Sequence, residues 1–400
     1  MKLEVIMFNM SNFSDWEKGI VNRNRHIFYT LRKNPNIQRL VAIDFLPFTL
    51  KRAVKNFYGS ILRRPKPGSE VIHQDLTSRC IKLPSEGPPE TYVYSSIDSF
   101  FSSQLFFKKL NHILEKISGE GERKDLLHRV VWSYFPMFVD YFNTLQADSY
   151  VFDAVDNWLE HTSFSQYKKK LERNYKIIGA KSDLIFAVAP NLIEFFRSFG
   201  REKNVYAIEN GVDFDHFNKE INYKDKRFEK LKRPIVGYVG TIEERIDADL
   251  LAYLASQNQD KSFALIGPVW PNFRKEAKKF KIFKNVYLFD RCPYEASPYY
   301  IQKFDVAIIP HKMNKFMKYT SSLKLLEYLA CGKPAVTIPA SGAEKVGPLV
   351  YLASGYAEFN KRINQALVEN NPELVEKRKE YAQSESWEKK TEEMLKLLNF

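Results

Sequence analysis

The chain has 400 residues, of which 44% are hydrophobic and 14% aromatic. This length and composition exclude a disordered or fibrous protein and are typical of two folded domains. The formal net charge of +13 would suit nucleic acid, an anionic membrane surface or phosphorylated substrates, so charge alone does not choose among these partners.

The first half predicts an α/β domain. Short apolar runs predict strands over residues 3–8, 40–43, 149–152 and 184–188, and helical periodicity predicts helices over residues 24–31, 100–117, 167–177 and 192–199. A Pro-rich and basic insertion over residues 45–94 has no clear pattern. The first residues are expected to form a buried strand rather than a signal peptide. No run of about 18 apolar residues predicts a membrane-spanning helix.

The second half has a more regular pattern. Apolar runs of a few residues, bounded by Gly or Pro, alternate with helical stretches, notably residues 247–254 and 323–330. This alternation predicts a parallel sheet covered by helices on both faces. We therefore expect two Rossmann-like domains, residues 1–210 and 211–375, facing each other across a cleft. A C-terminal helix within residues 376–400 is expected to pack back on the first domain. Ligands are expected at the carboxyl ends of the strands.

The cysteines Cys80, Cys292 and Cys331 are few and far apart. They match neither a disulfide framework nor a metal-binding spacing. We expect reduced thiols in a cytoplasmic protein.

The densest group of candidate residues is YTSSLKLLEYLACGKPAV, residues 319–336. Thr320, Ser321 and Ser322 are suitable N-cap residues for a helix that Gly332 would end. The positive end of that helix is an anion site, and a bound phosphate would offset the unfavourable charge of Lys324 in the first turn. Glu327 lies one turn later on the same face, where it could accept hydrogen bonds from a ribose. The alternative is an ordinary surface Lys–Glu pair on a capped helix.

Six segments, this one among them, follow one another in a familiar order. They are residues 209–213 with Phe217, 237–241 with Arg245, 265–268, 285–288, 304–310 and 323–334. In that order and spacing they resemble the C-terminal domain of GT-B-fold glycosyltransferases of the family-4, or group 1, type. Each segment alone is weakly specific, but six in order are strongly specific.

The resemblance implies a nucleotide-sugar donor in the second domain and an acceptor in the first. Glu327 matches the glutamate that binds the ribose, and the helix start matches the residues that hold the diphosphate. The nucleobase would rest near residues 291–294. The implied donor-binding residues are Gly240, Thr241, Arg245, Arg291, Tyr294, Ser322, Leu323, Lys324 and Glu327. Neither a cofactor nor a metal is expected.

One position departs from the family pattern. The first glutamate of the family's pair, which contacts the transferred sugar, is replaced by Tyr319. The sugar contacts are therefore not carried over. This form of the motif resembles that of bacterial surface-polysaccharide and teichuronic-acid-type transferases.

Two Asp-x-Asp triplets, residues 213–215 and 247–249, could suggest a metal site. One follows Asn-Gly in a turn and the other stands where a helix begins. We expect both to serve as helix caps.

A carboxylate pair in the first half is the candidate for the catalytic base. An apolar strand ends at residues 153–156 of YVFDAVDNW, which places Asp153 and Asp156 at the carboxyl edge of the sheet. Inverting transfer needs a base beside the acceptor hydroxyl. The segment also resembles one in the polysaccharide transferases, where Asp156 matches the better-placed acid. We predict Asp156 as the base and Asp153 as the second candidate, the alternative being that both orient loops.

Two further features of the first domain point to the acceptor side. Arg25 and His26 start a predicted helix that, by the resemblance, lines the acceptor, although a lone histidine there could simply be packed. Residues 48–64 mix apolar and basic side chains and could form a cationic membrane-facing helix or an ordinary basic loop. The membrane-facing candidates are Lys51, Arg52, Lys55, Arg63 and Arg64.

The sequence thus predicts a hexosyltransferase for surface polysaccharide synthesis. It would move a sugar from a UDP- or GDP-type donor to a lipid-linked or glycan acceptor, in the cytoplasm at the inner face of the membrane. The alternatives are a sugar-nucleotide epimerase of the same fold and a basic nucleic-acid-binding protein, although no nucleic-acid motif is found. Inversion and retention both stay open.

Overall fold

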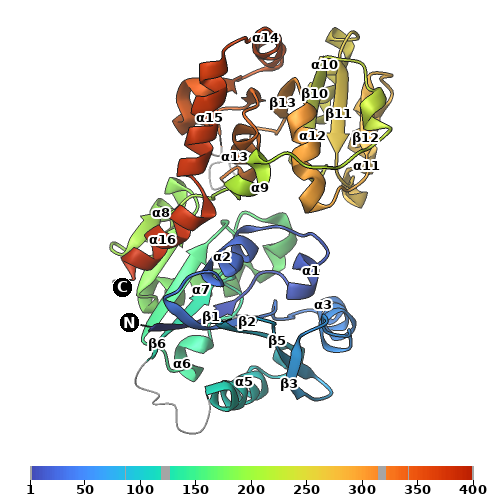
Figure 1. Cartoon of the computed structure of the whole chain (residues 1–400). Coiled ribbons are helices and arrows are strands. Elements are labelled where there is room, and N and C mark those ends of the chain that lie inside the picture. The colour runs from blue at the N-terminus through green and yellow to red at the C-terminus, as the bar shows by residue number, and fades with distance from the viewer. Residues whose placement is uncertain (1, 86, 119–126, 314–320, 341, 399–400) are drawn as a thin grey trace. The chain divides into compact units, whose positions relative to one another are not determined.

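The computed structural model describes residues 2–398 except 86, 119–126, 314–320 and 341. The chain divides into two compact units (Figure 1). The first comprises Met1–Glu209 with Thr391–Phe400, and the second comprises Asn210–Lys390. The sequence placed the corresponding boundaries at residues 210 and 375. Among the described residues, no helix combines the length and apolarity needed to cross a bilayer.

The first unit is built on a nine-stranded sheet. Its strand order is β3-β4-β5-β2-β1-β6-β7-β8-β9, parallel except where β4 pairs with β3 and β5. The strands are β1 (Lys2–Phe8), β2 (Ile37–Ile43), β3 (Glu70–Gln74), β4 (Ser78–Lys82), β5 (Glu90–Ser96), β6 (Leu127–Ser133), β7 (Ser149–Ala154), β8 (Leu184–Ala187) and β9 (Val205–Ala207). Strand β1 is buried on both faces from Leu3 onward, as a central parallel strand must be.

Helices cover the first sheet. They are α1 (Phe13–Trp16), α2 (Arg23–Leu31), α3 (Leu50–Asn56), α4 (Asp98–Phe101), α5 (Ser103–Ser118), α6 (Tyr141–Thr144), α7 (Lys168–Lys181) and α8 (Pro190–Arg197). A π-helical turn, η1 (Phe57–Ile61), continues α3. The last helix, α16 (Trp387–Leu397), carries the chain from the second unit back to the first.

The four predicted strands and three of the four predicted helices of this unit are confirmed within a few residues. The predicted helix over residues 100–117 is instead two helices, α4 and α5. The unassigned insertion forms α3, η1, β3, β4 and most of β5. Strand β6 was missed because its polar start, Leu-His-Arg, hides the apolar run; Arg129 there pairs with Glu4 of β1.

The second unit is a six-stranded, fully parallel sheet in the order β12-β11-β10-β13-β14-β15. Its strands are β10 (Ile235–Val239), β11 (Ser262–Ile266), β12 (Val286–Phe289), β13 (Val306–Ile309), β14 (Ala335–Thr337) and β15 (Tyr351–Leu352). Its helices are α9 (Phe214–Asn218), α10 (Ala248–Gln257), α11 (Arg274–Lys281), α12 (Ser297–Lys303), α13 (Leu323–Ala330), α14 (Tyr356–Leu367) and α15 (Pro372–Ser384).

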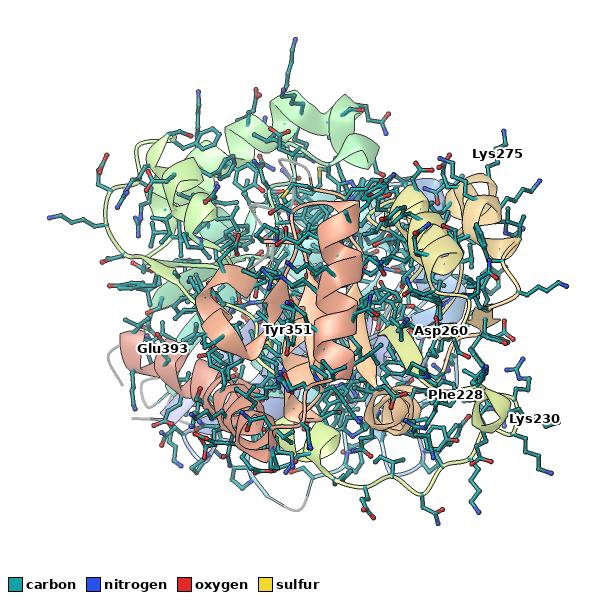
Figure 2. All side chains as sticks on the ribbon, turned by 90° about the horizontal axis from the view of Figure 1, so that it is seen from above. Phe228, Lys230, Asp260, Lys275, Tyr351 and Glu393 are labelled. Atoms are coloured by element: carbon teal, nitrogen blue, oxygen red, sulfur yellow. The ribbon has the colours of Figure 1, made fainter. Side chains whose placement is uncertain are left out.

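The sheet of the second unit separates two apolar layers. Phe228 is buried in one of them, whereas Lys230, Asp260 and Lys275 are exposed on the outside of the unit (Figure 2). The alternation of short apolar runs with helices therefore predicted the parallel sheet of this half, but the short strand β15 was not predicted.

The strand order marks where each unit would bind a ligand. Strand β10 lies between β11 and β13, and β1 lies between β2 and β6. Successive connections run to opposite sides of these two strands, so a crevice is expected at their carboxyl ends. In the second unit that end is Gly240.

Candidate active site

Glycines close the carboxyl end of the second sheet. Gly240 follows β10 with φ +146°, a conformation that L side chains rarely adopt. A Cβ there would lie 2.2 Å from Cε of Lys324. Gly267, after β11, has φ +145°, and its Cβ would lie 2.1 Å from the carbonyl oxygen of Gly240. Both positions need glycine, and the turn they form leaves room for the lysine.

The predicted helix over residues 323–330 is confirmed as α13. Ser322 caps it, since its side chain accepts a hydrogen bond from the N–H of Leu325. Asn210 holds the preceding residue by donating from its side-chain amide to the carbonyl oxygen of Ser321, at 2.9 Å. The first N–H groups of such a helix have no partner within it and form an anion site. Tyr319, the site of the departure from the family pattern, lies outside the described residues.

The ionisable side chains of this helix are Lys324, Glu327 and Tyr328, and the first two are half-buried. Burial and, to a smaller extent, the charge of Arg245 lower the pKa of Lys324 to about 8. Burial raises the pKa of Glu327 to about 7 against the attraction of Lys324. Within the described residues neither side chain has a hydrogen bond or an ion pair; the Lys324 ammonium lies 5.7 Å from the centre of the Tyr238 ring. Half-buried ionisable side chains with shifted pKa values and no ion pair are suited to binding a charged ligand.

A second and a third basic group lie close to Lys324. Arg245 lies in the loop after β10, where its Nε donates to Glu243 at 2.6 Å. His311 follows β13 and is buried; burial, together with the charges of Lys324 and Arg245, holds its pKa well below the usual range. The N–H of Lys312 donates to the carbonyl oxygen of Arg245 at 2.8 Å and joins the two loops. The positive charge of Lys324 and Arg245 thus gathers at the start of α13.

His311, Glu243 and Tyr238 were not predicted as site residues. Their positions in the sequence could have indicated them. Tyr238 lies on β10, and Glu243 and His311 follow the carboxyl ends of β10 and β13. Thr241, which was predicted, lies in the same turn and accepts a hydrogen bond through its carbonyl oxygen from the Tyr238 hydroxyl at 3.0 Å.

The segment predicted to hold the nucleobase lies near α13. Burial raises the pKa of the Cys292 thiol to about 11, and the charge of Glu327 contributes to that rise. The neighbouring Arg291 is exposed. Tyr294 stacks on His216 of α9, with ring centres 4.4 Å apart. The structure therefore brings this segment beside the ribose candidate.

The two Asp-x-Asp triplets are helix caps, as predicted. Asp213 accepts the N–H of His216 at the start of α9, and Asp247 accepts the N–H of Leu250 at the start of α10. In the part of the chain that the structure describes, no three His, Cys, Asp or Glu side chains are grouped so as to hold a metal ion. That transfer needs no metal stays a prediction.

The carboxylates proposed for the base have different environments. Asp153, on β7, is fully buried, and Nε of Arg23 donates to both of its oxygens, at 2.9 and 3.1 Å. This pair fixes α2 to the sheet, so Asp153 is poorly suited to accept a substrate proton. Asp156 lies two residues beyond the strand and is half-buried. It is the better candidate, and its role stays a prediction.

The acceptor-side candidates occupy the first turn of α2. Asn22 caps this helix by accepting the N–H of Arg25 at 3.2 Å. The Arg25 guanidinium lies 4.9 Å from the centre of the Tyr29 ring, and His26 is buried. The helix follows β1, so its start lies at the carboxyl edge of the first sheet. Contact with an acceptor stays a prediction.

The basic candidates lie on α3 and just after η1. Lys51, Lys55, Arg63 and Arg64 are exposed, whereas Arg52 is half-buried with its guanidinium 4.6 Å from the centre of the Phe45 ring. Of the two readings of this segment, the helical one describes its backbone over α3 and η1, and contact with a membrane stays a prediction.

Comparisons with known proteins agree with this geometry. Residues 219–385 match the family model for glycosyl transferases group 1. The chain is 26% identical over 307 residues to TuaH of Bacillus subtilis (strain 168), named as a teichuronic acid biosynthesis glycosyltransferase. That match covers 71% of this chain and 75% of TuaH.

Solved structures of the same fold cover the whole chain. HepE of Anabaena, in complex with UDP and glucose, matches with a TM-score of 0.64 at 13% identity, over 99% of each chain. Sucrose-phosphate synthase of Thermosynechococcus elongatus matches with a TM-score of 0.66 at 14% identity, over 100% of this chain and 98% of that one. A TarM variant of S. aureus, in complex with Fondaparinux, alpha-GlcNAc-glycerol and UDP, matches with a TM-score of 0.60 at 13% identity, over 100% of both chains.

The family match falls on the unit that carries the glycine turn, the capped helix and the basic cluster. The structural matches extend the likeness to the first unit. Residues 219–385 therefore match the group 1 glycosyltransferases, and the chain has the GT-B fold.

Proposed function

We propose that this enzyme transfers a hexose from a nucleoside-diphosphate sugar to a lipid-linked or glycan acceptor in surface polysaccharide synthesis. The observation that carries the proposal is the start of α13, where Lys324 and Arg245 concentrate positive charge beside a half-buried Glu327. The structures of HepE and TarM contain UDP, which favours UDP over GDP as the nucleotide.

The donor site would act mainly on the leaving group. The free N–H groups of α13 and the ammonium of Lys324 would stabilise the negative charge that grows on the diphosphate as the glycosidic bond breaks. Arg245 adds positive charge from the facing loop. Glu327, once ionised, would accept hydrogen bonds from the ribose hydroxyls and so orient the nucleotide. These groups need no metal to neutralise the diphosphate.

On the acceptor side we assign the base to Asp156. Its carboxylate would remove the proton of the acceptor hydroxyl as that oxygen attacks the anomeric carbon. Such a step inverts the anomeric configuration. The stereochemistry of the product therefore tests this assignment, since a retained configuration would contradict it.

The donor site is tested by thermal denaturation against a panel of UDP- and GDP-sugars. A ligand that binds only the folded state raises the melting temperature. We expect UDP-sugars to raise it in the wild type and not in Glu327→Ala. Glu376→Ala, at an exposed position of α15, is the matched control and should respond as the wild type does. An equal response of Glu327→Ala would refute the ribose assignment.

The base assignment is tested separately. Asp156→Asn should keep the nucleotide-induced rise in melting temperature and lose transfer. Full turnover by this variant would show that Asp156 is not the base.

The two alternative functions have distinct signatures. An epimerase would interconvert sugar nucleotides without any acceptor. A nucleic-acid-binding protein would shift DNA or RNA in a salt-dependent mobility assay. No feature of the described residues favours either alternative.

A further inference from the structure

Exposed apolar side chains gather in one part of the first unit. Of the fourteen large hydrophobic side chains that are exposed in the described chain, eight belong to residues 50–105. They are Leu50, Val54, Tyr58, Leu62, Val71, Leu76, Phe101 and Leu105. Single exposed apolar residues are common, but a concentration of this kind marks an interaction surface.

Four of these side chains form a stripe along α3 and η1. Leu50, Val54, Tyr58 and Leu62 recur every fourth residue, which places them along one side of a helix. Between 47% and 67% of each is exposed. We call these four residues the apolar stripe. Because its side chains face solvent, it adds nothing to the core of the unit.

Polar contacts fix the opposite side of this helix. Asn56 is buried, and its side-chain amide donates to the carbonyl oxygen of Phe45 at 2.8 Å. The side-chain oxygen of Asn56 accepts a hydrogen bond from the side-chain amide of Asn12 at 2.7 Å. The hydroxyl of Ser60 lies 3.1 Å from that of Ser14. The inner face of the helix is therefore already anchored, which leaves the stripe available for a partner.

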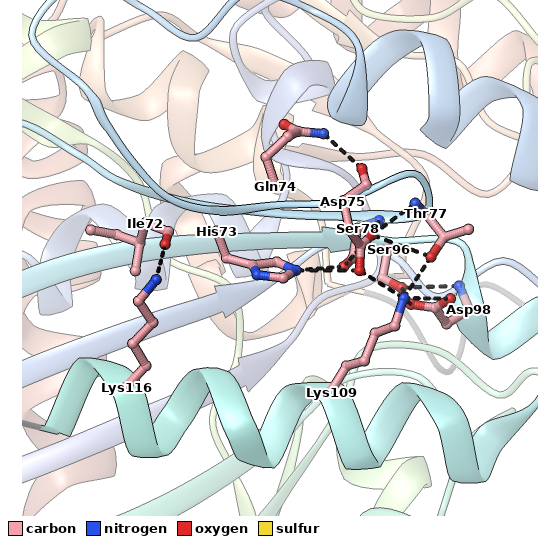
Figure 3. A network of polar contacts seen from close by, with 10 residues as sticks. All are labelled: Ile72, His73, Gln74, Asp75, Thr77, Ser78, Ser96, Asp98, Lys109 and Lys116. Carbon is pink, nitrogen blue, oxygen red and sulfur yellow. Dashed lines mark hydrogen bonds and ion pairs between the residues drawn. The ribbon is translucent and has the colours of Figure 1, made fainter.

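The neighbouring elements are tied together in the same way. The Lys109 ammonium of α5 pairs with Asp75 at 2.8 Å and with Asp98 at 3.1 Å (Figure 3). These contacts fasten the β3–β4 hairpin, whose tip carries Leu76, to the helices that carry Phe101 and Leu105. The elements that carry these exposed apolar residues are therefore connected to one another by ion pairs.

The charge around the stripe is positive. Residues 48–69 contain Lys51, Arg52, Lys55, Arg63, Arg64 and Lys66 and no acidic residue. Asp15 pairs with Lys55 at 2.7 Å, and Glu17 lies 2.9 and 3.2 Å from the amino groups of Arg63 and Lys66. Lys51 and Arg64 have no ion pair among the described residues. Positive charge therefore remains in excess.

A small recess lies behind the stripe, on the inner side of η1. Ser14, Ser60, Arg63, Arg64, Lys66 and Arg79 line part of its wall. Glu17 and Asp44 line it too, but Asp44 is saturated by the N–H of Phe13 at 2.6 Å and the hydroxyl of Ser95 at 2.7 Å. The exposed cations beside the apolar stripe, Lys51 and Arg64, match the phosphate layer of a bilayer, which lies directly outside its acyl chains.

We propose that the apolar stripe and its flanking cations dock the first unit onto an anionic phospholipid bilayer. The stripe would enter the interfacial region while Lys51 and Arg64 contact lipid phosphates. A second copy of the chain fits less well, because it would oppose two surfaces of the same positive charge. The inference rests on the lipid-linked form of the acceptor in the proposed function, but its test needs no transfer reaction.

The test is flotation of the full chain with vesicles. Vesicles of phosphatidylcholine alone are compared with vesicles that also contain phosphatidylglycerol, at low and high salt. We expect the wild type to float with the anionic vesicles only, and less at high salt. The variant Leu50→Ser/Val54→Ser/Leu62→Ser should bind about tenfold more weakly or worse. Its control is Ile282→Ser/Val368→Ser, at two exposed apolar positions of the second unit.

The charge component is tested by Lys51→Glu/Arg64→Glu, which should also lose about tenfold or more in affinity for anionic vesicles. Lys275→Glu/Lys281→Glu, at exposed positions of α11, should bind as the wild type does. All changed positions are exposed, and an unaltered melting temperature confirms that each variant folds.

Three outcomes would overturn the proposal. They are no vesicle binding by the wild type, equal binding to neutral and anionic vesicles, and undiminished binding of the stripe variant. A wild-type dimer that the stripe variant converts to monomer would instead assign the surface to a second copy. Transfer to a soluble acceptor by a protein that does not bind vesicles would leave the proposed function intact.

Discussion

Replacing Glu327 by glutamine should stabilise the protein while weakening its nucleotide binding. Burial raises the pKa of this carboxyl from 4.5 to about 7. In the unfolded chain the group ionises near 4.5, so between these two values the folded state holds a proton that the unfolded state has lost. Folding is therefore penalised as pH rises through this range, and fully penalised above it. Glutamine, which does not ionise, escapes this penalty.

The size of the effect follows from the pKa shift. At 1.36 kcal/mol per pKa unit, the full shift corresponds to about 3 kcal/mol. Glu327 is partly open to water, and its removal also takes away an attraction for Lys324. We therefore expect Glu327→Gln to be more stable by about 1 kcal/mol at pH 8. In a unit of this size that is a rise of roughly 2–4 °C in melting temperature.

The assay is thermal denaturation at pH 4 and at pH 8, with and without UDP. Without nucleotide, the variant should match the wild type at pH 4 and exceed it at pH 8. With UDP, the order at pH 8 should reverse, because the ribose has lost its acceptor. Glu376→Gln, on exposed α15, should show neither effect. A variant that is less stable than the wild type at pH 8 would mean that the carboxylate supports the fold rather than the ligand.

Two further substitutions test other parts of the structure. Asp153→Asn removes the carboxylate charge opposite Arg23 in a fully buried pair, so it should destabilise the first unit by about 3 kcal/mol, measured by urea denaturation; a loss below about 0.5 kcal/mol would contradict its structural role. Gly240→Ala places a methyl group 2.2 Å from Lys324 Cε in a disfavoured backbone conformation. Calorimetric titration should show at least about tenfold weaker UDP binding, whereas Gly355→Ala, which meets no atom within 4 Å, should bind UDP normally.

Helix α13 could be predicted from the sequence because its determinants are local. The cap at Ser322, the apolar repeat that follows and the stop at Gly332 all lie within a dozen residues, and α13 has the predicted bounds. The same holds for the caps at Asp213 and Asp247. Strands β10, β11 and β13 were predictable because each is a short apolar run that ends directly before Gly or Pro.

Other features depend on residues far apart in the chain. Arg23 and Asp153 are 130 positions apart, and no spacing rule pairs them, so Asp153 first looked like a candidate base. His311 joins Lys324 and Arg245 only because β13 lies beside β10 in the sheet. Strand β6 was missed because its apolar run is short and follows His128 and Arg129, and the partner of Arg129 on β1 is far away in the sequence.

The sequence by itself therefore determined the fold class, the capped helix over residues 323–330 and the basic character of residues 48–64. Only the tertiary structure decided which charges meet and which apolar side chains stay uncovered. Periodicity indicates which face of a helix is apolar. An apolar side chain at every fourth residue, however, is found on buried faces and on exposed ones alike. Leu50, Val54, Tyr58 and Leu62 are exposed because Asn56 and Ser60, on the other side, are the groups that bond to the unit.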